Sequence, residues 1–264
     1  MQWWLAYLAI GSVVGFFAGL LGIGGGMVMV PMLAWVFAAQ GLAAEHIVHL
    51  ALGTSMATIM FTSVSSMRAH HAHDAVDWKV ARAMAPGILT GSFLAALAAG
   101  LIATRPLAVM FTLLVFYAAT QILFDLRPQR SRELPGPAGV FAAGAGIGAI
   151  SSLLAAGGAF MCIPFLAWCS VPLRRAIGTA AAVGLPIAVA GTAGYVLQGL
   201  RVAGLPAATL GYVYLPALAL VVVTSMLAAP LGARVAHRVP VKRLRIVFAV
   251  VLYALAARML AALW

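Results

Sequence analysis

Charged residues are scarce in this chain of 264 residues, where they make up only 8% of the composition. Soluble domains carry about a quarter charged residues, so this shortage excludes an ordinary soluble fold. Hydrophobic residues make up 64%, and the mean hydropathy is +1.09. Lipid offers no hydrogen-bond partner to the backbone, so continuous apolar runs of about 20 residues predict helices that cross a membrane. The sequence therefore predicts an all-α polytopic membrane protein.

Acidic residues are rarer still: the chain has five, and each falls in a predicted loop or at a predicted helix end. A carboxylate inside the membrane is the usual partner of a proton or a cation. Its absence disfavours cation transport and favours an anionic substrate held by neutral dipoles. The net charge of +11 comes from basic residues in short loops, so it indicates orientation in the lipid bilayer and not binding to nucleic acid.

Cysteine and catalytic motifs are also nearly absent. The only two cysteines, Cys162 and Cys169, lie in one apolar stretch, which excludes a disulfide framework and disfavours a metal pair. The chain has no H-E-x-x-H and no G-x-S-x-G motif, so we expect neither an enzyme nor a bound cofactor. Loop 68–79 holds three histidines and two aspartates, but neighbours in a short loop do not automatically share a metal ion. We expect no metal site and a loop that anchors its helices at the cytoplasmic surface.

Ten apolar segments organise the chain. Two of them, 24–39 and 157–170, follow glycine-rich breaks and are short for a straight crossing of a membrane core about 30 Å thick. If both cross, all but two of the fifteen basic residues in loops fall on one side, with Arg105 and Arg201 on the other; if both turn back, the division is seven against eight. The positive-inside rule therefore favours crossing. The other eight segments predict full spans at 3–21, 47–66, 84–103, 107–124, 137–155, 176–197, 210–231 and 246–263.

The glycine-rich segment Gly11–Trp35 recurs 133 residues later as Gly144–Trp168, with ten of its 25 positions identical. Each half then holds about five membrane segments, and because five is an odd number the second repeat is inverted relative to the first. Both termini would lie in the periplasm of a bacterial cell, with the chain in its inner membrane. The expected divisions are an N-terminal repeat at 1–126, a cytoplasmic linker at 127–137 and a C-terminal repeat at 138–264.

The two glycine-rich breaks form the predicted substrate site. Transporters built from inverted repeats bind substrate where helices break near the middle of the membrane. A helix that begins at such a break presents free N–H groups and a partial positive charge, which favours an anion. The predicted substrate-binding residues are the breaks and the polar positions early in the helices that follow: Gly24, Gly25, Gly26, Thr54, Ser55, Gly157, Gly158, Ala159 and Thr179.

Some of these residues have a second interpretation. A threonine in a membrane helix often bonds its own backbone, so Thr54 and Thr179 are either ligands or structural residues. Small residues spaced four apart predict close helix packing and not binding. Two matching ridges of this kind are Gly11, Gly15 and Gly19 in one copy and Gly144, Gly148 and Ser152 in the other.

Three further residues are weaker candidates. His49 lies just inside a predicted span and is the candidate for proton coupling, although an interfacial histidine more often only forms hydrogen bonds. Arg174 and Arg175 precede a predicted helix on the cytoplasmic side. They either attract anions towards the entrance or only orient the protein.

The motif set resembles the TauE/SafE family of sulfite exporters and sulfonate permeases over nearly the whole chain. The resemblance is carried by Gly15-Phe-x-x-Gly19-Leu-x-Gly22-Ile-Gly24-Gly25-Gly26-x4-Pro31-x-Leu33, by Gly53-Thr54-Ser55, by Val76-Asp77-Trp78 and by the second copy. It implies a secondary transporter that moves a small sulfur-containing or organic anion, such as sulfite, a sulfonate or sulfoacetate, by alternating access. The alternatives are an anion channel and a transporter of another small solute.

The second copy departs from this pattern. It has Ala155, Ala156 and Ala159 where the first copy has Gly22, Ile23 and Gly26. The two half-sites are therefore chemically unequal, and we expect the first to be the better anion cradle. The expected partners are the anion and the lipid bilayer, with the chain either a monomer or a homodimer.

Overall fold

The computed structural model describes residues 2–21, 25–124, 133–236 and 241–261, and these form ten helices and one short β-hairpin. Each half of the chain supplies five helices. The first half forms α1 (Gln2–Leu21), α2 (Gly26–Ala39), α3 (Ile47–Ala72), α4 (Trp78–Leu101) and α5 (Thr104–Phe124). The second half forms α6 (Pro137–Leu153), α7 (Ala159–Trp168), α8 (Leu173–Gly199), α9 (Leu215–Ala236) and α10 (Val241–Ala261). The hairpin of β1 (Thr209–Leu210) and β2 (Val213–Tyr214) precedes α9.

Six of these helices, α3, α4, α5, α8, α9 and α10, are long and apolar enough to cross a membrane by length and composition. The remaining four are apolar but shorter, which confirms an all-α polytopic membrane protein. The expected eight full spans are not all equally long. The apolar stretches Trp3–Gly19 in α1 and Pro137–Leu153 in α6 fall a few residues short of the usual 20 or so.

The two halves interlock through their first and fourth helices. Helix α1 packs along α9, and α6 packs along α4. A methyl group on Gly15 would overlap the backbone of Ser225, and one on Gly148 would lie 3.0 Å from the Cα atom of Ile88. The glycine ridges therefore let helix backbones touch, as their spacing predicts.

The two halves are inverted relative to each other. Gly53, near the start of α3, lies against Tyr212, which follows α8. In the matching contact, Gly178 near the start of α8 lies against Ala75, which follows α3. Because each helix starts where the other ends, α3 and α8 run antiparallel.

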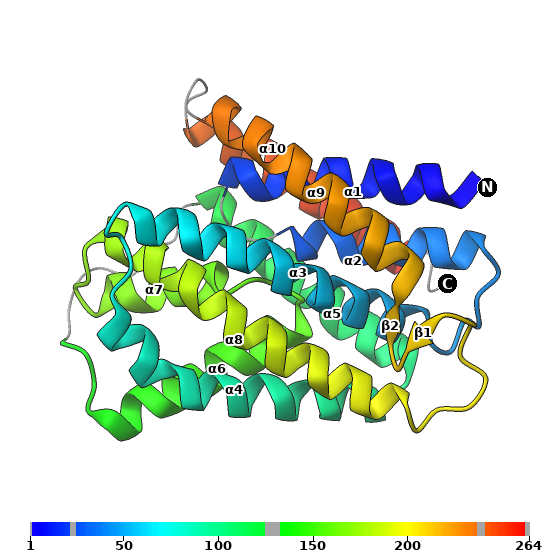
Figure 1. Cartoon of the computed structure of the whole chain (residues 1–264), viewed down its shortest axis with the longest axis horizontal. Coiled ribbons are helices and arrows are strands. Elements are labelled where there is room, and N and C mark those ends of the chain that lie inside the picture. The colour runs from blue at the N-terminus through cyan, green and yellow to red at the C-terminus, as the bar shows by residue number, and fades with distance from the viewer. Residues whose placement is uncertain (1, 22–24, 125–132, 237–240, 262–264) are drawn as a thin grey trace.

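The bundle therefore has two distinct ends (Figure 1). We call the end with β1–β2 the hairpin end, and it lies at the right of Figure 1 together with the N-terminus. We call the opposite end, where residues 73–77 join α3 to α4, the histidine end. Helix α2 returns the chain to the end where α1 began, because Gln40 at its C-terminus donates a 2.5 Å hydrogen bond to the Tyr7 hydroxyl of α1.

The two helix breaks meet inside the bundle. Gly26, the first residue of α2, lies so close to the carbonyl oxygen of Ala155, between α6 and α7, that a methyl group there would overlap it. Both residues are buried. The fold therefore brings the starts of both short helices into its interior, where the sequence predicts the substrate site.

Candidate functional site

A cavity of about 330 Å³ opens at the histidine end beside the second break. Its walls come from both halves: α1, the C-terminal half of α3, the N-terminal half of α8 and α9, with the start of α7 at its base. Gly157, Gly158 and Ala159 line it, so the structure brings these three predicted residues together at one cavity. The polar lining is largely hydroxyl groups, from Thr62, Ser63, Ser65, Ser66 and Ser225.

The helix break at this cavity has a clear local cause. Helix α6 ends as the chain turns through Ala155, whose φ of 45° is left-handed, and the Ala156 N–H donates to the Ser151 carbonyl at 2.9 Å. Helix α7 then begins afresh at Gly158, whose carbonyl accepts its first helical hydrogen bond, from Cys162, at 3.0 Å. The N–H groups of the first turn of α7 have no acceptor within that helix, so they are available to a ligand.

This cavity has no aspartate, glutamate, lysine or arginine among its described lining residues, and the N-terminus of α7 gives it a partial positive potential. His70 is the titratable group in this described lining. Hydroxyl groups and helix N-termini donate hydrogen bonds to anions without needing a fixed positive charge. The cavity can thus hold a small anion and offers no carboxylate to hold a cation.

The described residues of the first break do not line this cavity. Gly25 and Gly26 are buried, and a methyl group on Gly25 would overlap the Val14 side chain, while Gly24 lies outside the described residues. In this conformation the cavity adjoins the second copy, and the expectation that the first copy is the better anion cradle stays a prediction. At the first copy, the Ile59 side chain of α3 lies 3.0 Å from a methyl group placed on Gly26.

The repeated threonines join the two halves. The Thr54 hydroxyl accepts a 2.9 Å hydrogen bond from the backbone N–H of Tyr214, just before α9. The Thr179 hydroxyl accepts a 2.9 Å bond from the N–H of Asp77, just before α4. Each threonine therefore holds the start of the other half's fourth helix. Neither lines the histidine-end cavity, and Ser55 beside Thr54 is fully buried.

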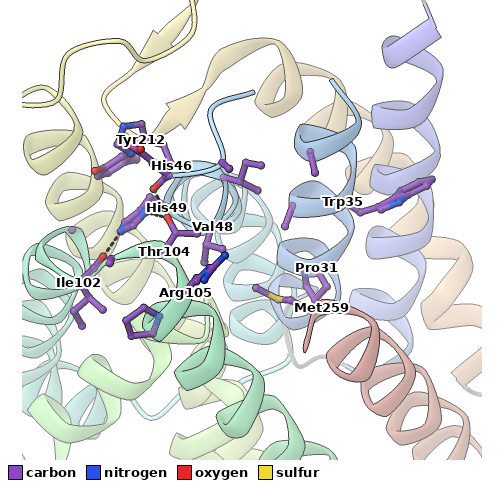
Figure 2. Close-up of a pocket in the computed structure, with 18 of the residues that line it drawn as sticks. Pro31, Trp35, His46, Val48, His49, Ile102, Thr104, Arg105, Tyr212 and Met259 are labelled. Atoms are coloured by element: carbon purple, nitrogen blue, oxygen red, sulfur yellow. Dashed lines mark hydrogen bonds between the residues drawn. The ribbon is translucent and has the colours of Figure 1, made fainter. Parts of the chain in front are cut away.

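A larger cavity of about 1200 Å³ lies at the hairpin end (Figure 2). Figure 2 shows Pro31 and Trp35 of α2 on one side, Arg105 of α5 on the other and Met259 of α10 below. Apart from Glu45, His46, His49, Arg105 and Arg258, its described lining is neutral and mainly apolar. The Arg258 guanidinium lies 4.8 Å from the centre of the Trp35 ring, an arrangement that stabilises the cation. None of the predicted substrate-binding residues lines this cavity.

His49 braces the hairpin end. Its Nε2 atom lies 3.1 Å from the Ala99 carbonyl oxygen and 3.0 Å from that of Ile102, so it donates to the link between α4 and α5 (Figure 2). Its ring stacks on that of Tyr212, with the ring centres 4.9 Å apart. These contacts give His49 a positioning role, and proton coupling through it stays a prediction.

Polar residues of the histidine end support its loops. Arg174 donates a 2.7 Å hydrogen bond to the His73 carbonyl, while Arg175 is exposed nearby. The Asp77 carboxylate caps α4 by accepting from the N–H groups of Lys79 and Val80. No group of three potential metal ligands occurs among the described residues. Attraction of anions by the two arginines stays a prediction.

The hydroxyl residues in the C-terminal half of α3 are not among the predicted site residues. Thr62, Ser63, Ser65 and Ser66 lie in the C-terminal half of that helix, and all four line the histidine-end cavity. Four hydroxyl groups within five residues of an apolar helix were the available signal.

An inverted bundle whose helix breaks meet at the centre, beside a hydroxyl-lined cavity, has the architecture of a membrane transporter. The chain belongs to the sulfite exporter TauE/SafE family, whose profile matches residues 7–259. No solved structure matches the chain.

Curated relatives have the same broad description. A probable membrane transporter protein of Haemophilus influenzae is 33% identical over 256 residues, which cover 97% of each chain. A probable membrane transporter protein of Methanocaldococcus jannaschii is 25% identical, with 93% of this chain and 91% of the relative covered. The probable membrane transporter protein YdhB of Bacillus subtilis is 27% identical over 71% of this chain and 76% of its own.

Proposed function

We propose that this protein is a secondary transporter of small sulfur-containing or organic anions, such as sulfite, a sulfonate or sulfoacetate, across the bacterial inner membrane. The observation that carries the proposal is the neutral, hydroxyl-lined cavity at the start of α7. Its volume of about 330 Å³ lies at the small end of the range for ligand pockets, which suits a small anion. The sulfite exporter family gives independent support for the sulfur oxyanion class.

The mechanism we propose is alternating access between the inverted halves. In this conformation the histidine-end cavity adjoins the second break, whereas Gly25 and Gly26 of the first break line neither this cavity nor the hairpin-end cavity. An anion would enter from the histidine end and accept hydrogen bonds from the first turn of α7 and from Ser63 and Ser66. Movement of one half against the other would then expose the anion to the hairpin end.

Uptake into proteoliposomes tests this function. We expect the wild-type protein to exchange labelled sulfite or sulfoacetate with saturable kinetics, as a conformational cycle requires and an open channel does not. The double variant Ser63→Ala/Ser66→Ala should raise KM by about tenfold or more, because each hydrogen bond to a charged group contributes about 1.5–3 kcal/mol.

The matched control is Ser12→Ala, which removes an exposed hydroxyl that bonds only the Leu8 carbonyl of its own helix. It should leave KM unchanged. Saturable exchange of these anions by the Ser63→Ala/Ser66→Ala protein with an unaltered KM would contradict the site. Transport of nickel or other cations, with no transport of sulfur-containing or organic anions, would contradict the substrate class.

A further inference from the structure

Four serine hydroxyl groups are buried without a hydrogen-bond partner among the described residues: Ser55, Ser92, Ser151 and Ser152. Each of the four side chains is fully buried, with an exposed fraction of 0%. They account for four of the six buried side-chain polar atoms in this condition. A buried donor without an acceptor costs free energy, so a cluster of them needs a functional or conformational reason.

The inverted repeat relates these serines to the open cavity. Gly15 of α1 contacts Ser225 of α9, and Gly148 of α6 contacts Ile88 of α4. These equivalent contacts align α1 with α6 and α9 with α4. The Gly53 and Gly178 contacts align α3 with α8 in the same way. In this alignment the counterparts of Ser55, Ser92, Ser151 and Ser152 are Ala180, Ala229, Ala18 and Gly19 respectively. All four counterparts line the histidine-end cavity.

Ser92 lies at the contact of α4 with α6, and α8 packs against α4, against α6 and against α3, the helix that carries Ser55. A methyl group placed on Gly191 of α8 would lie 2.9 Å from Ser152 Oγ and would overlap the end of the Met56 side chain. A methyl group placed on Gly148 would lie 2.8 Å from Ser92 Oγ. Small residues and hydroxyl groups from four helices therefore converge on one region nearer the hairpin end.

Beside the buried serines, two large side chains fill the space that corresponds to the open cavity at the histidine end. Met56 reaches Gly191, and the Tyr195 hydroxyl lies 3.5 Å from the Ser152 carbonyl oxygen as its donor. Their repeat counterparts are Ala181 and His70, and both of these line the open cavity. The equivalent position is thus an open cavity at the histidine end and is filled by side chains beside the buried serines.

We infer that Ser55, Ser92, Ser151 and Ser152 form a second anion site that opens towards the hairpin end when the histidine-end cavity closes. The inference rests on the proposed transport function. The four hydroxyl groups would donate to a small oxyanion together with the first turn of α2, which begins at Gly26. The anion supplies the acceptors that these hydroxyl groups lack in the present conformation.

Opening this site requires Met56 and Tyr195 to withdraw. Met56 is flexible and unbranched, so it can leave Gly191 by changing rotamers. The Tyr195 hydroxyl makes its contact with the backbone of Ser152 on α6, so separation of α6 from α8 would break it. The two cavities are then open in different conformations, as alternating access demands.

Cysteine labelling from each side of the membrane tests the inference. In full-length protein with Cys162→Ala and Cys169→Ala, single Ser92→Cys and Ser151→Cys variants are treated with a charged, membrane-impermeant thiol reagent. The matched controls are their repeat counterparts, Ala229→Cys and Ala18→Cys. We expect each serine position to be labelled only from the side opposite to the one that labels its counterpart.

Adding Met56→Ala should shift the balance between the two conformations. Labelling of Ser92→Cys should become severalfold faster, and labelling of Ala229→Cys should slow, because the plug is lost at one site only. Protein that still exchanges sulfite but whose Ser92→Cys and Ser151→Cys forms react from neither side, or from the same side as their counterparts, would overturn the inference. Opposite-sided labelling in protein that carries no sulfur anion would instead overturn only the proposed substrate class.

Discussion

Ala155 and Ala208 both have a left-handed backbone conformation, but the first is buried and the second is exposed. Ala155 has φ 45° and Ala208 has φ 65°, a region that costs a residue with a Cβ roughly 1–2 kcal/mol. Ala155 is fully buried at the break before α7, whereas Ala208 is exposed near the hairpin. Glycine removes the strain at both positions, but at Ala155 it also loses a buried methyl group worth about 0.8 kcal/mol.

We therefore predict that Ala208→Gly stabilises the protein by about 1 kcal/mol, while Ala155→Gly has little net effect. Thermal unfolding in detergent, followed by tryptophan fluorescence, measures both. Ala207→Gly is the control, because Ala207 is also exposed but does not have a positive φ. A melting temperature for Ala208→Gly equal to or below that of Ala207→Gly would show that the left-handed turn carries no strain.

At the scale of helices, close backbone contact between α6 and α4 holds the two halves together. Gly148 faces α4, and a methyl group there would lie 2.8 Å from Ser92 Oγ and 3.0 Å from the Ile88 Cα atom. Gly146, on the same helix, has nothing within 4 Å of the place a methyl group would take. Alanine substitutions at these two glycines therefore measure the effect of packing separately from the effect of helix propensity.

We predict that Gly148→Ala destabilises the protein by about 1–3 kcal/mol, since it overfills a packed interface. Gly146→Ala should instead stabilise α6 by up to about 1 kcal/mol, because alanine is the better helix former. Chemical or thermal unfolding of the purified proteins gives the comparison. Equal stability of the two variants would mean that α6 can move away from α4 without loss.

The sequence predicts the helices and their repetition, but it does not predict which residues of different helices contact one another. Apolar length and glycine breaks predict the ten helices of the described residues, although α9 begins at Leu215 and not at residue 210, and glycine spacing predicts which helix faces pack. The partner of Thr54 could not be found this way, because Tyr214 is remote in the sequence and joins it only through the inverted repeat. Which break adjoins a cavity could not be found either, since it depends on how remote side chains such as Ile59 pack beside Gly26.

At the scale of the whole molecule, charge separates the two ends and predicts the orientation in the membrane. Arg174 lies near the histidine end, whereas Arg105 and Arg201 lie near the hairpin end. Among the described residues, Lys79 and Arg82 in the first turns of α4 also lie at the histidine end, while Arg258 of α10 lines the hairpin-end cavity. The positive-inside rule therefore predicts that the histidine end faces the cytoplasm and that the hairpin end, where α1 begins and α10 ends, faces the periplasm.

Fusion of reporters to the full-length chain tests this orientation. Alkaline phosphatase, which is active only after export, should be active at either terminus, whereas green fluorescent protein at the C-terminus should stay dark. The inverted architecture makes the two termini a joint test, because ten crossings require both to lie on one side. Inactive phosphatase at both termini, together with a fluorescent C-terminal fusion, would reverse the orientation and open the hydroxyl-lined cavity to the periplasm. Opposite results at the two termini would show an odd number of crossings, and the second repeat could not then be inverted in the membrane.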